Sequence, residues 1–465
     1  MGCIFNNISS EIHDLILDHF NLPPALSSWN PDPQQIRASR DTLRAYSLVS
    51  RSCCIMARRR LFSSIILYVG LTPDFPNLNL TEIAAATEHF ATMIQDSVKF
   101  PNIGMSYFIQ SFTFTIPAAC IKNRVMRFLR KPSIYRILDA LHGPSHGITS
   151  LTLNMGVGRL DYVKLERELV RALEDITHSP KLKHLHINGL IDIPISLFHG
   201  VRLKTLELIR ARVLREEGGH KCGVSIIETI SLDNMLSFDG LIQHSNDASS
   251  NSLIFASPKA LYIQGGSLPN AVKFAISTAL YTLQSLSVHV DAPPTAEYPF
   301  HLLAGLSLLR ILHGKDTSRN RKKELQQVLE LCTLPPSLMS LTIETYDQDC
   351  LPYPTDWVDI DSVLVQTSFS CIPQVQIIFR LSCDANNHNR MKNLFEVRNL
   401  ALSKAGEALP KFLKARKGAS RPVLGVTISI YDDRERCKAL TMKFGGKQTF
   451  EMPAAHQHIH WSLWC

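Results

Sequence analysis

The chain is 465 residues long, with 45% hydrophobic residues, 19% charged residues and a formal net charge of +8 at pH 7. This composition excludes wholesale disorder, and the length exceeds the roughly 250–300 residues at which a single hydrophobic core stops growing. The chain therefore folds either as several domains or as a repeat whose core lengthens without thickening. The small, scattered positive charge does not favour nucleic-acid binding.

The cysteines and the apolar runs bear on the compartment. Eleven cysteines is an odd number, and none lie in a C-x-x-C pair, which favours reduced thiols over disulfides or a zinc site. The sequence shows no secretory signal and no uncharged apolar stretch of about 18 residues. We therefore expect an intracellular protein, in the cytoplasm or nucleus, with no membrane span.

The first predicted element is a helix over residues 8–20. Ile12, Leu15, Ile16 and Phe20 recur at three- and four-residue spacing, which is typical of one apolar helix face. Pro23 and Pro24 end this helix.

A loop and two further elements are expected next. The polar stretch Ser27 to Arg40 predicts a loop, and a second helix is expected to begin near Asp41, a good capping residue. Residues 51–60 continue as helix, and the alternation in Phe62-x-x-Ile65-x-Leu67 predicts a strand.

Two clusters of residues in this part of the chain share the spacing of a known family. The first cluster is Ile8, Glu11, Ile12, Leu15, Ile16 and Phe20, and the second is Leu48, Val49, Arg51, Ala57, Arg58, Leu61 and Phe62. Together they resemble the F-box family, in the form common in fungi. The resemblance implies a small helical module that binds a Skp-type adaptor, and through it a cullin–RING ubiquitin ligase, by an apolar helical surface. It gives these adaptor-binding candidates: Ile8, Ile12, Leu15, Ile16, Leu48 and Val49. The alternative is a helical hairpin that only caps the downstream core.

A degenerate pattern, apolar-x-x-apolar-x-apolar, recurs along the rest of the chain. Its copies are Ile109-Phe112-Phe114, Ile148-Leu151-Leu153, Leu182-Leu185-Ile187, Leu203-Leu206-Leu208, Ile227-Ile230-Leu232, Leu283-Leu286-Val288, Leu306-Leu309-Ile311, Leu338-Leu341-Ile343, Ile372-Val375-Ile377 and Val423-Val426-Ile428, with Pro258-Leu261-Ile263 as a variant. The last two positions alternate as in a strand with one buried face, and segments of helical periodicity, such as Leu165 to Ile176, lie between copies. The pattern is similar to divergent leucine-rich repeats, whose regular spacing of roughly 20–29 residues several units here exceed.

A doubly wound α/β domain also alternates strands and helices. Its strands are buried on both faces and form continuous apolar runs, whereas Lys183-His184-Leu185-His186-Ile187 alternates with polar residues. The pattern therefore favours a parallel sheet with one polar face, presented as an extended concave surface. We expect the following residues on that face to bind a substrate protein: Lys183, His184, His186, Lys204, Glu207, Tyr262, His289 and Glu344.

The predicted architecture is thus α/β, with a small helical F-box-like module followed by a leucine-rich-repeat-like solenoid that carries helices on its convex side. The module is expected at residues 1–67, with a loop insertion at about 21–40, the solenoid at 68–435, and a carboxy-terminal extension at 436–465.

No catalytic motif, phosphate-binding loop or cofactor fingerprint is present in the sequence. His456, His458 and His460 share one face of an extended tail and, with Cys465, have the chemistry of a zinc site, although a loosely ordered tail is the preferred interpretation. The sequence therefore predicts a non-catalytic receptor without metal or cofactor, which binds an adaptor and a substrate protein but neither nucleic acid nor a membrane.

Overall fold

A computed structural model of the chain describes most of its central part. The described stretches are 33–69, 80–100, 104–116, 122–143, 146–156, 160–214, 224–233, 255–256, 258–265, 268–290, 298–313, 319–347, 357–366, 371–383, 409–411, 423–432, 438–439 and 459–464, with a few single residues between them. The chain divides into two compact units, Met1–Ala256 and Ser257–Cys465, called unit 1 and unit 2 below.

Unit 1 begins, in its described part, with a helical hairpin made of α2 (Pro33–Ser47) and α3 (Arg51–Leu61). The Ser50 side chain caps α3 by accepting a hydrogen bond from the Cys53 N–H at 3.1 Å. Leu43, Cys53 and Ala57 are completely buried in this part of the unit.

The predicted start of the second helix is wrong. Helix α2 already covers residues 33–40, which we expected to be loop. Asp41, the expected cap, lies inside the helix and accepts a hydrogen bond from Arg44 Nη1 at 3.2 Å on its exposed surface. The predicted helix at 8–20 lies outside the described residues.

The sheet of unit 1 consists of parallel strands that follow one another in chain order. They are β1 (Ser64–Tyr68), β2 (Ser111–Ile116), β3 (Ser150–Met155), β5 (His184–Asn188), β8 (Arg202–Ile209) and β10 (Ser225–Asp233), with the short β11 (Phe255–Ala256) beside β10. Two parallel pairs, β4 (Leu160–Asp161) with β6 (Leu190–Ile191) and β7 (Ile193–Pro194) with β9 (Val213–Leu214), extend beyond the main strands.

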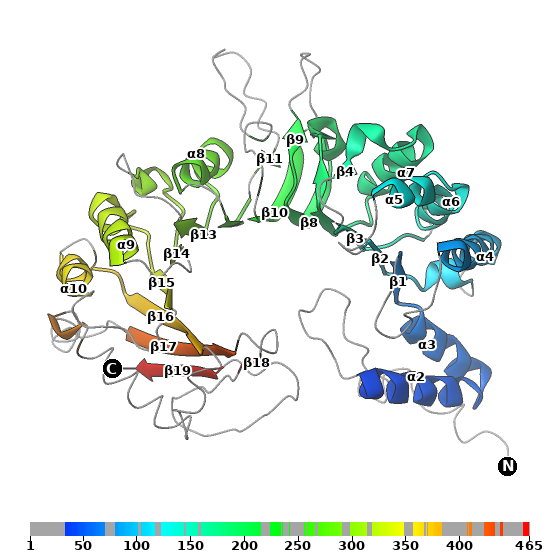
Figure 1. The fold of residues 1–465 in the computed structure, drawn as a ribbon, viewed down its shortest axis with the longest axis horizontal. Coiled ribbons are helices and arrows are strands. Elements are labelled where there is room, and N and C mark those ends of the chain that lie inside the picture. The colour runs from blue at the N-terminus through cyan, green and yellow to red at the C-terminus, as the bar shows by residue number, and fades with distance from the viewer. Residues whose placement is uncertain are drawn as a thin grey trace. The chain divides into compact units, whose positions relative to one another are not determined.

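Helices cover one face of this sheet, as Figure 1 shows. They are α4 (Leu80–Val98), α5 (Lys122–Leu129), α6 (Pro132–Ala140) and α7 (Arg167–Thr177), with the 3₁₀ turns η2 (Met105–Tyr107), η3 (Tyr162–Lys164) and η4 (Ile195–Phe198). In α7 the buried positions Leu169, Leu173 and Ile176 recur at the spacing of one helix face. This face packs on the sheet, which agrees with the helix predicted over Leu165 to Ile176.

The recurring sequence pattern lies in register across unit 1. Its central residues Phe112, Leu151, Leu185, Leu206 and Ile230 are neighbours on successive strands. All are at most 2% exposed. The apolar positions therefore form continuous rows on the helix-covered face. Ile65 of β1 pairs with Phe112, so Phe62-x-x-Ile65-x-Leu67 supplies the first strand of this sheet.

A hydrogen-bond pattern repeats at the start of the strands. At the start of a strand, two successive backbone N–H groups donate to the same carbonyl oxygen, at 2.7–3.0 Å. That carbonyl belongs to the residue at the start of the preceding strand. In unit 1 these donor pairs are Gln110 and Ser111 to Ser63, Thr149 and Ser150 to Gln110, Lys183 and His184 to Thr149, and Lys204 and Thr205 to Lys183. In unit 2 they are Gln284 and Ser285 to Lys259, Ser307 and Leu308 to Gln284, and Met339 and Ser340 to Ser307. The backbone thus repeats along with the apolar residues.

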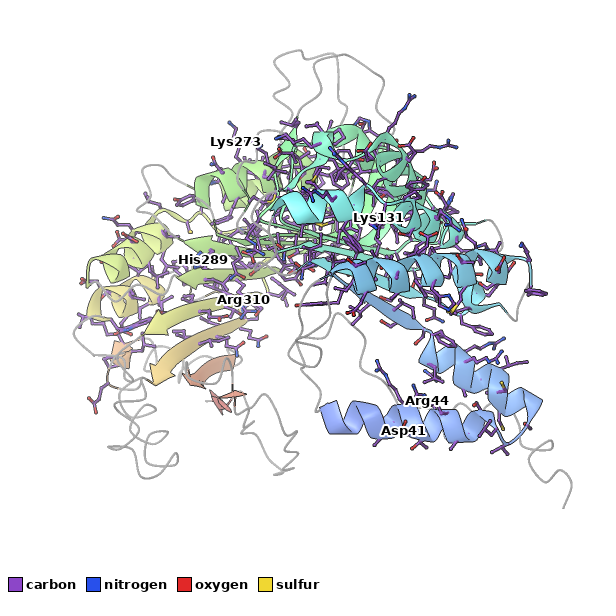
Figure 2. The ribbon with its side chains drawn as sticks, turned by 45° about the vertical axis from the view of Figure 1, so that its right-hand side comes forward. Asp41, Arg44, Lys131, Lys273, His289 and Arg310 are labelled. Carbon is purple, nitrogen blue, oxygen red and sulfur yellow. The ribbon has the colours of Figure 1, made fainter. Side chains whose placement is uncertain are left out.

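Unit 2 contains a second run of parallel strands in chain order. They are β12 (Ala260–Gln264), β13 (Ser285–Val290), β14 (Leu308–His313), β15 (Ser340–Asp347), β16 (Gln374–Cys383) and β17 (Val423–Asp432). Strands β18 (Lys438–Ala439) and β19 (Ile459–Trp464) pair with β17 in the antiparallel sense. The helical segments are α8 (Leu268–Ala279), η5 (Phe300–Leu302), α9 (Arg319–Leu331) and α10 (Val358–Leu364). Figure 2 shows Lys273 on α8, away from the strands that carry His289 and Arg310.

The last copy of the pattern, Val423-Val426-Ile428, lies two residues out of register with the copy before it. Val375, the central residue of the preceding copy, pairs with Leu424, whereas Val426 pairs with Ile377. The alternating apolar residues of β17 leave both registers open in the sequence, and the pairing decides between them.

Within each unit the strand order follows the chain without a reversal, whereas a doubly wound sheet reverses its order at a switch point. The protein is therefore α/β with a large parallel sheet, and its described part is compatible with a solenoid.

Candidate protein-binding surface

The face of the unit 1 sheet opposite the helices carries mostly polar side chains. Because side chains alternate along a strand, residues two apart on β3, β5 and β8 share this face, which we call the polar face. Two of its rows are Thr152–His186–Glu207 and Ser150–His184–Thr205, each made of register partners on neighbouring strands. A third row begins Asn154–Asn188.

An imidazole and a carboxylate are paired at the middle of the polar face. His186 Nδ1 lies 2.6 Å from Glu207 Oε2, and the side chains are 17% and 35% exposed. The hydrogen bond from His186 holds the pKa of Glu207 below its ordinary value, against the opposing effect of burial. Both sequence-predicted residues are thus brought together, with Glu207 ionised at neutral pH.

His184 occupies the adjacent row and contacts Thr205. Its Nδ1 lies 3.2 Å from Thr205 Oγ1. Burial lowers the pKa of His184, and the positive charge of Lys204 lowers it further. His184 is therefore neutral at pH 7, beside a lysine that is exposed to solvent.

An amide ladder that the sequence did not predict lies at the end of the strands. Asn188 Nδ2 donates to Asn154 Oδ1 at 3.1 Å, and Arg210 donates to Asn188 Oδ1 through Nε at 3.1 Å and Nη2 at 2.9 Å. Arg210 has a φ of +48°, a left-handed conformation that costs a non-glycine residue about 1–2 kcal/mol. Its N–H donates to the Asp233 carbonyl at 2.8 Å, which holds this conformation.

The two predicted lysines lie where the strands begin, just before the residues of the polar face. Alternation is interrupted there, since Leu203 and Leu206 are both buried and the exposed Lys204 lies between them. Lys183 Nζ donates to the Pro180 carbonyl at 3.1 Å, and Lys204 is exposed. The backbone places them side by side, since the Lys204 N–H donates to the Lys183 carbonyl at 2.7 Å.

The hydroxyl groups nearer β1 are less accessible. Thr113, Ser150 and Thr152 are 6–7% exposed, and their hydroxyl oxygens have no hydrogen-bond partner. Among β3, β5 and β8, the more accessible part of the polar face therefore lies over β5 and β8.

The predicted residues of unit 2 divide into accessible and buried ones. Tyr262 is 43% exposed and His289 is partly exposed. Glu344, which we expected to face solvent, is completely buried, so that expectation is wrong. It forms an ion pair with Arg310 on the neighbouring strand, so its carboxylate is not offered to a ligand in this structure.

The predicted adaptor-binding residues are described only in part. Leu48 is 87% exposed and Val49 is 48% exposed, in the turn between α2 and α3. Ile8, Ile12, Leu15 and Ile16 lie outside the described residues.

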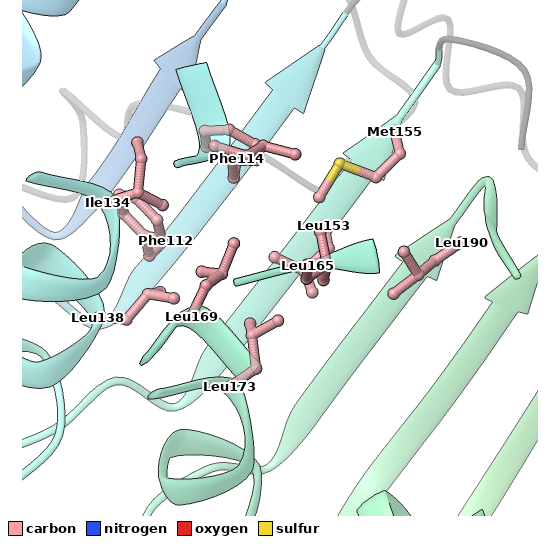
Figure 3. A pocket seen from close by; sticks show the side chains of 11 residues that line it. Phe112, Phe114, Ile134, Leu138, Leu153, Met155, Leu165, Leu169, Leu173 and Leu190 are labelled. Carbon is pink, nitrogen blue, oxygen red and sulfur yellow. The ribbon is translucent and has the colours of Figure 1, made fainter. Parts of the chain in front are cut away.

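A small apolar cavity lies between the helices and the sheet in the described part of unit 1. It measures about 20 Å³, too little for a substrate, and is lined by apolar side chains that include Phe112, Leu153, Leu169 and Leu173 (Figure 3). This is about the volume that one water needs, and the apolar lining gives a water nothing to bond to. The cavity therefore belongs to the packing of the core.

The described residues contain neither a metal-binding cluster nor a membrane-spanning helix. Among the described residues, no group of three or more His, Cys, Asp or Glu side chains is placed to hold a metal. Of the tail histidines, His460 lies in β19, while His456 and His458 fall outside the described stretches, as does Cys465. No helix in the described stretches has the length and apolar character needed to cross a bilayer.

Comparison with known proteins gives no relative: no protein-family model matches the chain, and no curated protein matches its sequence.

Proposed function

We propose that this protein is a non-catalytic substrate receptor of an SCF-type cullin–RING ubiquitin ligase. In this proposal the amino-terminal F-box-like segment binds a Skp-type adaptor. The strands that follow form divergent leucine-rich repeats and bind a substrate protein, while the partner subunits carry out ubiquitin transfer.

The main support for adaptor binding is the exposure of Leu48 and Val49. They form an adjacent apolar pair in the turn between two packed helices, and both are in the set that the F-box resemblance assigns to adaptor binding. The hairpin has its own buried residues in Leu43, Cys53 and Ala57. Burying two aliphatic side chains against a partner stabilises a complex by about 1.5–3 kcal/mol each, so the pair has the character of a docking contact.

The receptor half is supported by the architecture of the strands. Parallel strands in chain order bring side chains from distant parts of the sequence into rows on one face. Such a face is an extended surface, which suits another protein better than a small molecule. The residues on it are held by mutual hydrogen bonds, which lowers the entropy cost of binding.

The test is a pull-down of the full-length protein with purified Skp adaptor. Leu48→Asp combined with Val49→Asp places two charges in the proposed contact and is expected to abolish binding. The matched control is Val163→Asp, at a residue that is 67% exposed on η3, and it should bind normally.

Two outcomes contradict the ligase role. The first is no binding by the unmodified protein, and the second is binding that the double variant retains in full. Either would leave a repeat scaffold whose amino-terminal hairpin only caps the core.

A further inference from the structure

The charge at the two ends of the polar face is unbalanced. Within the described part of the chain, Lys183, Lys204 and Arg210 make no ion pair with a carboxylate: Lys183 donates to a backbone carbonyl and Arg210 to an amide oxygen. Glu207 supplies one negative charge, which its hydrogen bond to His186 does not remove. These three cations and one carboxylate leave a net positive charge over β5 and β8, which favours a negatively charged partner.

The hydrogen-bond directions leave donors facing outward at the Arg210 end. Within the described part of the chain, the hydrogen bonds of the Arg210 guanidinium, from Nε and Nη2, both go to the same Asn188 oxygen. This leaves both N–H groups of Nη1 for a ligand. Asn188 in turn donates to Asn154, whose own Nδ2 group remains a donor. A carboxylate or a carbonyl oxygen is the complement of this arrangement.

The spacing of the cations suits an extended chain. Lys204 and Arg210 lie near the two ends of β8, and six residues of strand span about 20 Å. An extended peptide has the same rise per residue, so acidic side chains about six residues apart would reach both cations.

We propose that the polar face of unit 1 binds an acidic, extended peptide segment of the partner protein, with carboxylates at Lys204 and Arg210. This inference rests on the proposed receptor role and specifies the kind of substrate segment. The strained backbone of Arg210, with its φ of +48°, agrees with a functional position, since strain is retained where geometry matters.

The test measures binding of a labelled peptide of alternating Glu and Ser residues to the full-length protein by fluorescence anisotropy. The Glu peptide is expected to bind, and its affinity is expected to fall as the salt concentration is raised, because exposed charges are screened. A peptide of alternating Lys and Ser should not bind. Lys204→Glu combined with Arg210→Glu should lower the affinity for the Glu peptide by about tenfold or more, equivalent to about 1.4 kcal/mol. Glu207→Gln should raise this affinity.

The control is a single charge reversal away from the polar face, half of the charge change in the double variant. Lys131 lies in the helical layer, in the exposed turn before α6 (Figure 2). The Lys131→Glu variant should bind the Glu peptide as tightly as the unmodified protein does. The NMR signal of the His184 imidazole provides a local readout. A carboxylate bound near Lys204 should raise the pKa of His184.

Three results would overturn the inference: no binding of the Glu peptide at low salt, equal loss with Lys131→Glu, or tighter binding of oligouridylate at the same residues. Adaptor binding by Lys204→Glu/Arg210→Glu is measured in parallel. If that binding persists while the Glu peptide fails, the acidic-peptide inference is lost and the adaptor proposal stands.

Discussion

At the scale of single residues, burial and pairing separate the structural positions from the exposed ones. Leu185 and its register neighbours are buried to within a few per cent, whereas His184 and His186, one residue to either side, face the opposite way. One strand therefore carries both the core and the candidate surface.

Leu185→Ala is expected to destabilise the protein by about 2–5 kcal/mol, since it leaves a cavity in a packed core. Denaturant unfolding checks this, with Val163→Ala as the control at an exposed position. Equal effects for the two variants would show that Leu185 does not lie in the core.

The Glu207 carboxylate should give a pH-dependent contribution to stability. Its pKa is lowered in the folded state, so its contribution is complete above the ordinary glutamate value of 4.5 and is lost as the pH falls through the folded-state pKa. Glu207→Gln should therefore be less stable than the unmodified protein at neutral pH, by no more than about 1 kcal/mol because the group is partly exposed.

The comparison is made by thermal unfolding over a range of pH. The difference between the two proteins should shrink below the ordinary glutamate value. A difference that grows in acid would contradict the hydrogen bond from His186.

At the scale of elements, the connections between helical turns and strands depend on glycine to different degrees. Gly189, after β5, has a φ of +77°, and a Cβ there would lie 2.2 Å from the Met155 carbonyl oxygen. Gly200, between η4 and β8, has a similar φ of +71° with no atom within 4 Å of such a Cβ.

Gly200→Ala should therefore cost only the strain of the left-handed backbone, about 1–2 kcal/mol. Gly189→Ala should cost clearly more, because the Met155 carbonyl must also move. Denaturant unfolding of both variants tests the close packing of Gly189 against the Met155 carbonyl. Equal losses of stability in the two variants would contradict that packing.

Much of the sheet could be predicted from the sequence, because strand alternation fixes which residues share a face. The last two apolar positions of the pattern lie in register on β3, β5 and β8, as the pattern indicated: Leu151, Leu185 and Leu206 form one row, and Leu153, Ile187 and Leu208 form the next. The start of helix α2 was predicted eight residues too late, at Asp41 instead of Pro33. Its first turns are mostly polar, so their helical state depends on packing against α3 rather than on their own periodicity.

The candidate surface was predicted less completely. His186 and Glu207 followed from alternation, but their contact requires the register between β5 and β8. Arg210 lies beyond the strand in a left-handed turn, and the burial of Glu344 depends on Arg310 of a neighbouring strand. Neither feature has a signal within one segment of sequence.

At the scale of the whole molecule, two exposed features lie on different parts of unit 1: the apolar turn at Leu48 and Val49, and the polar face over β5 and β8. A receptor that joins an adaptor to a substrate needs two such separate surfaces. We therefore expect that a substitution in the Leu48–Val49 turn leaves peptide binding at the polar face intact, and that a substitution in the polar face leaves adaptor binding intact.

Hydrogen–deuterium exchange of the full-length protein, with and without purified Skp adaptor, shows directly whether the helical hairpin binds the adaptor. We expect slower exchange on adding adaptor in peptides that cover α2, α3 and their turn, residues 33–61, and unchanged exchange in β5 and β8. Protection confined to the polar face, or no protection anywhere, would contradict this expectation.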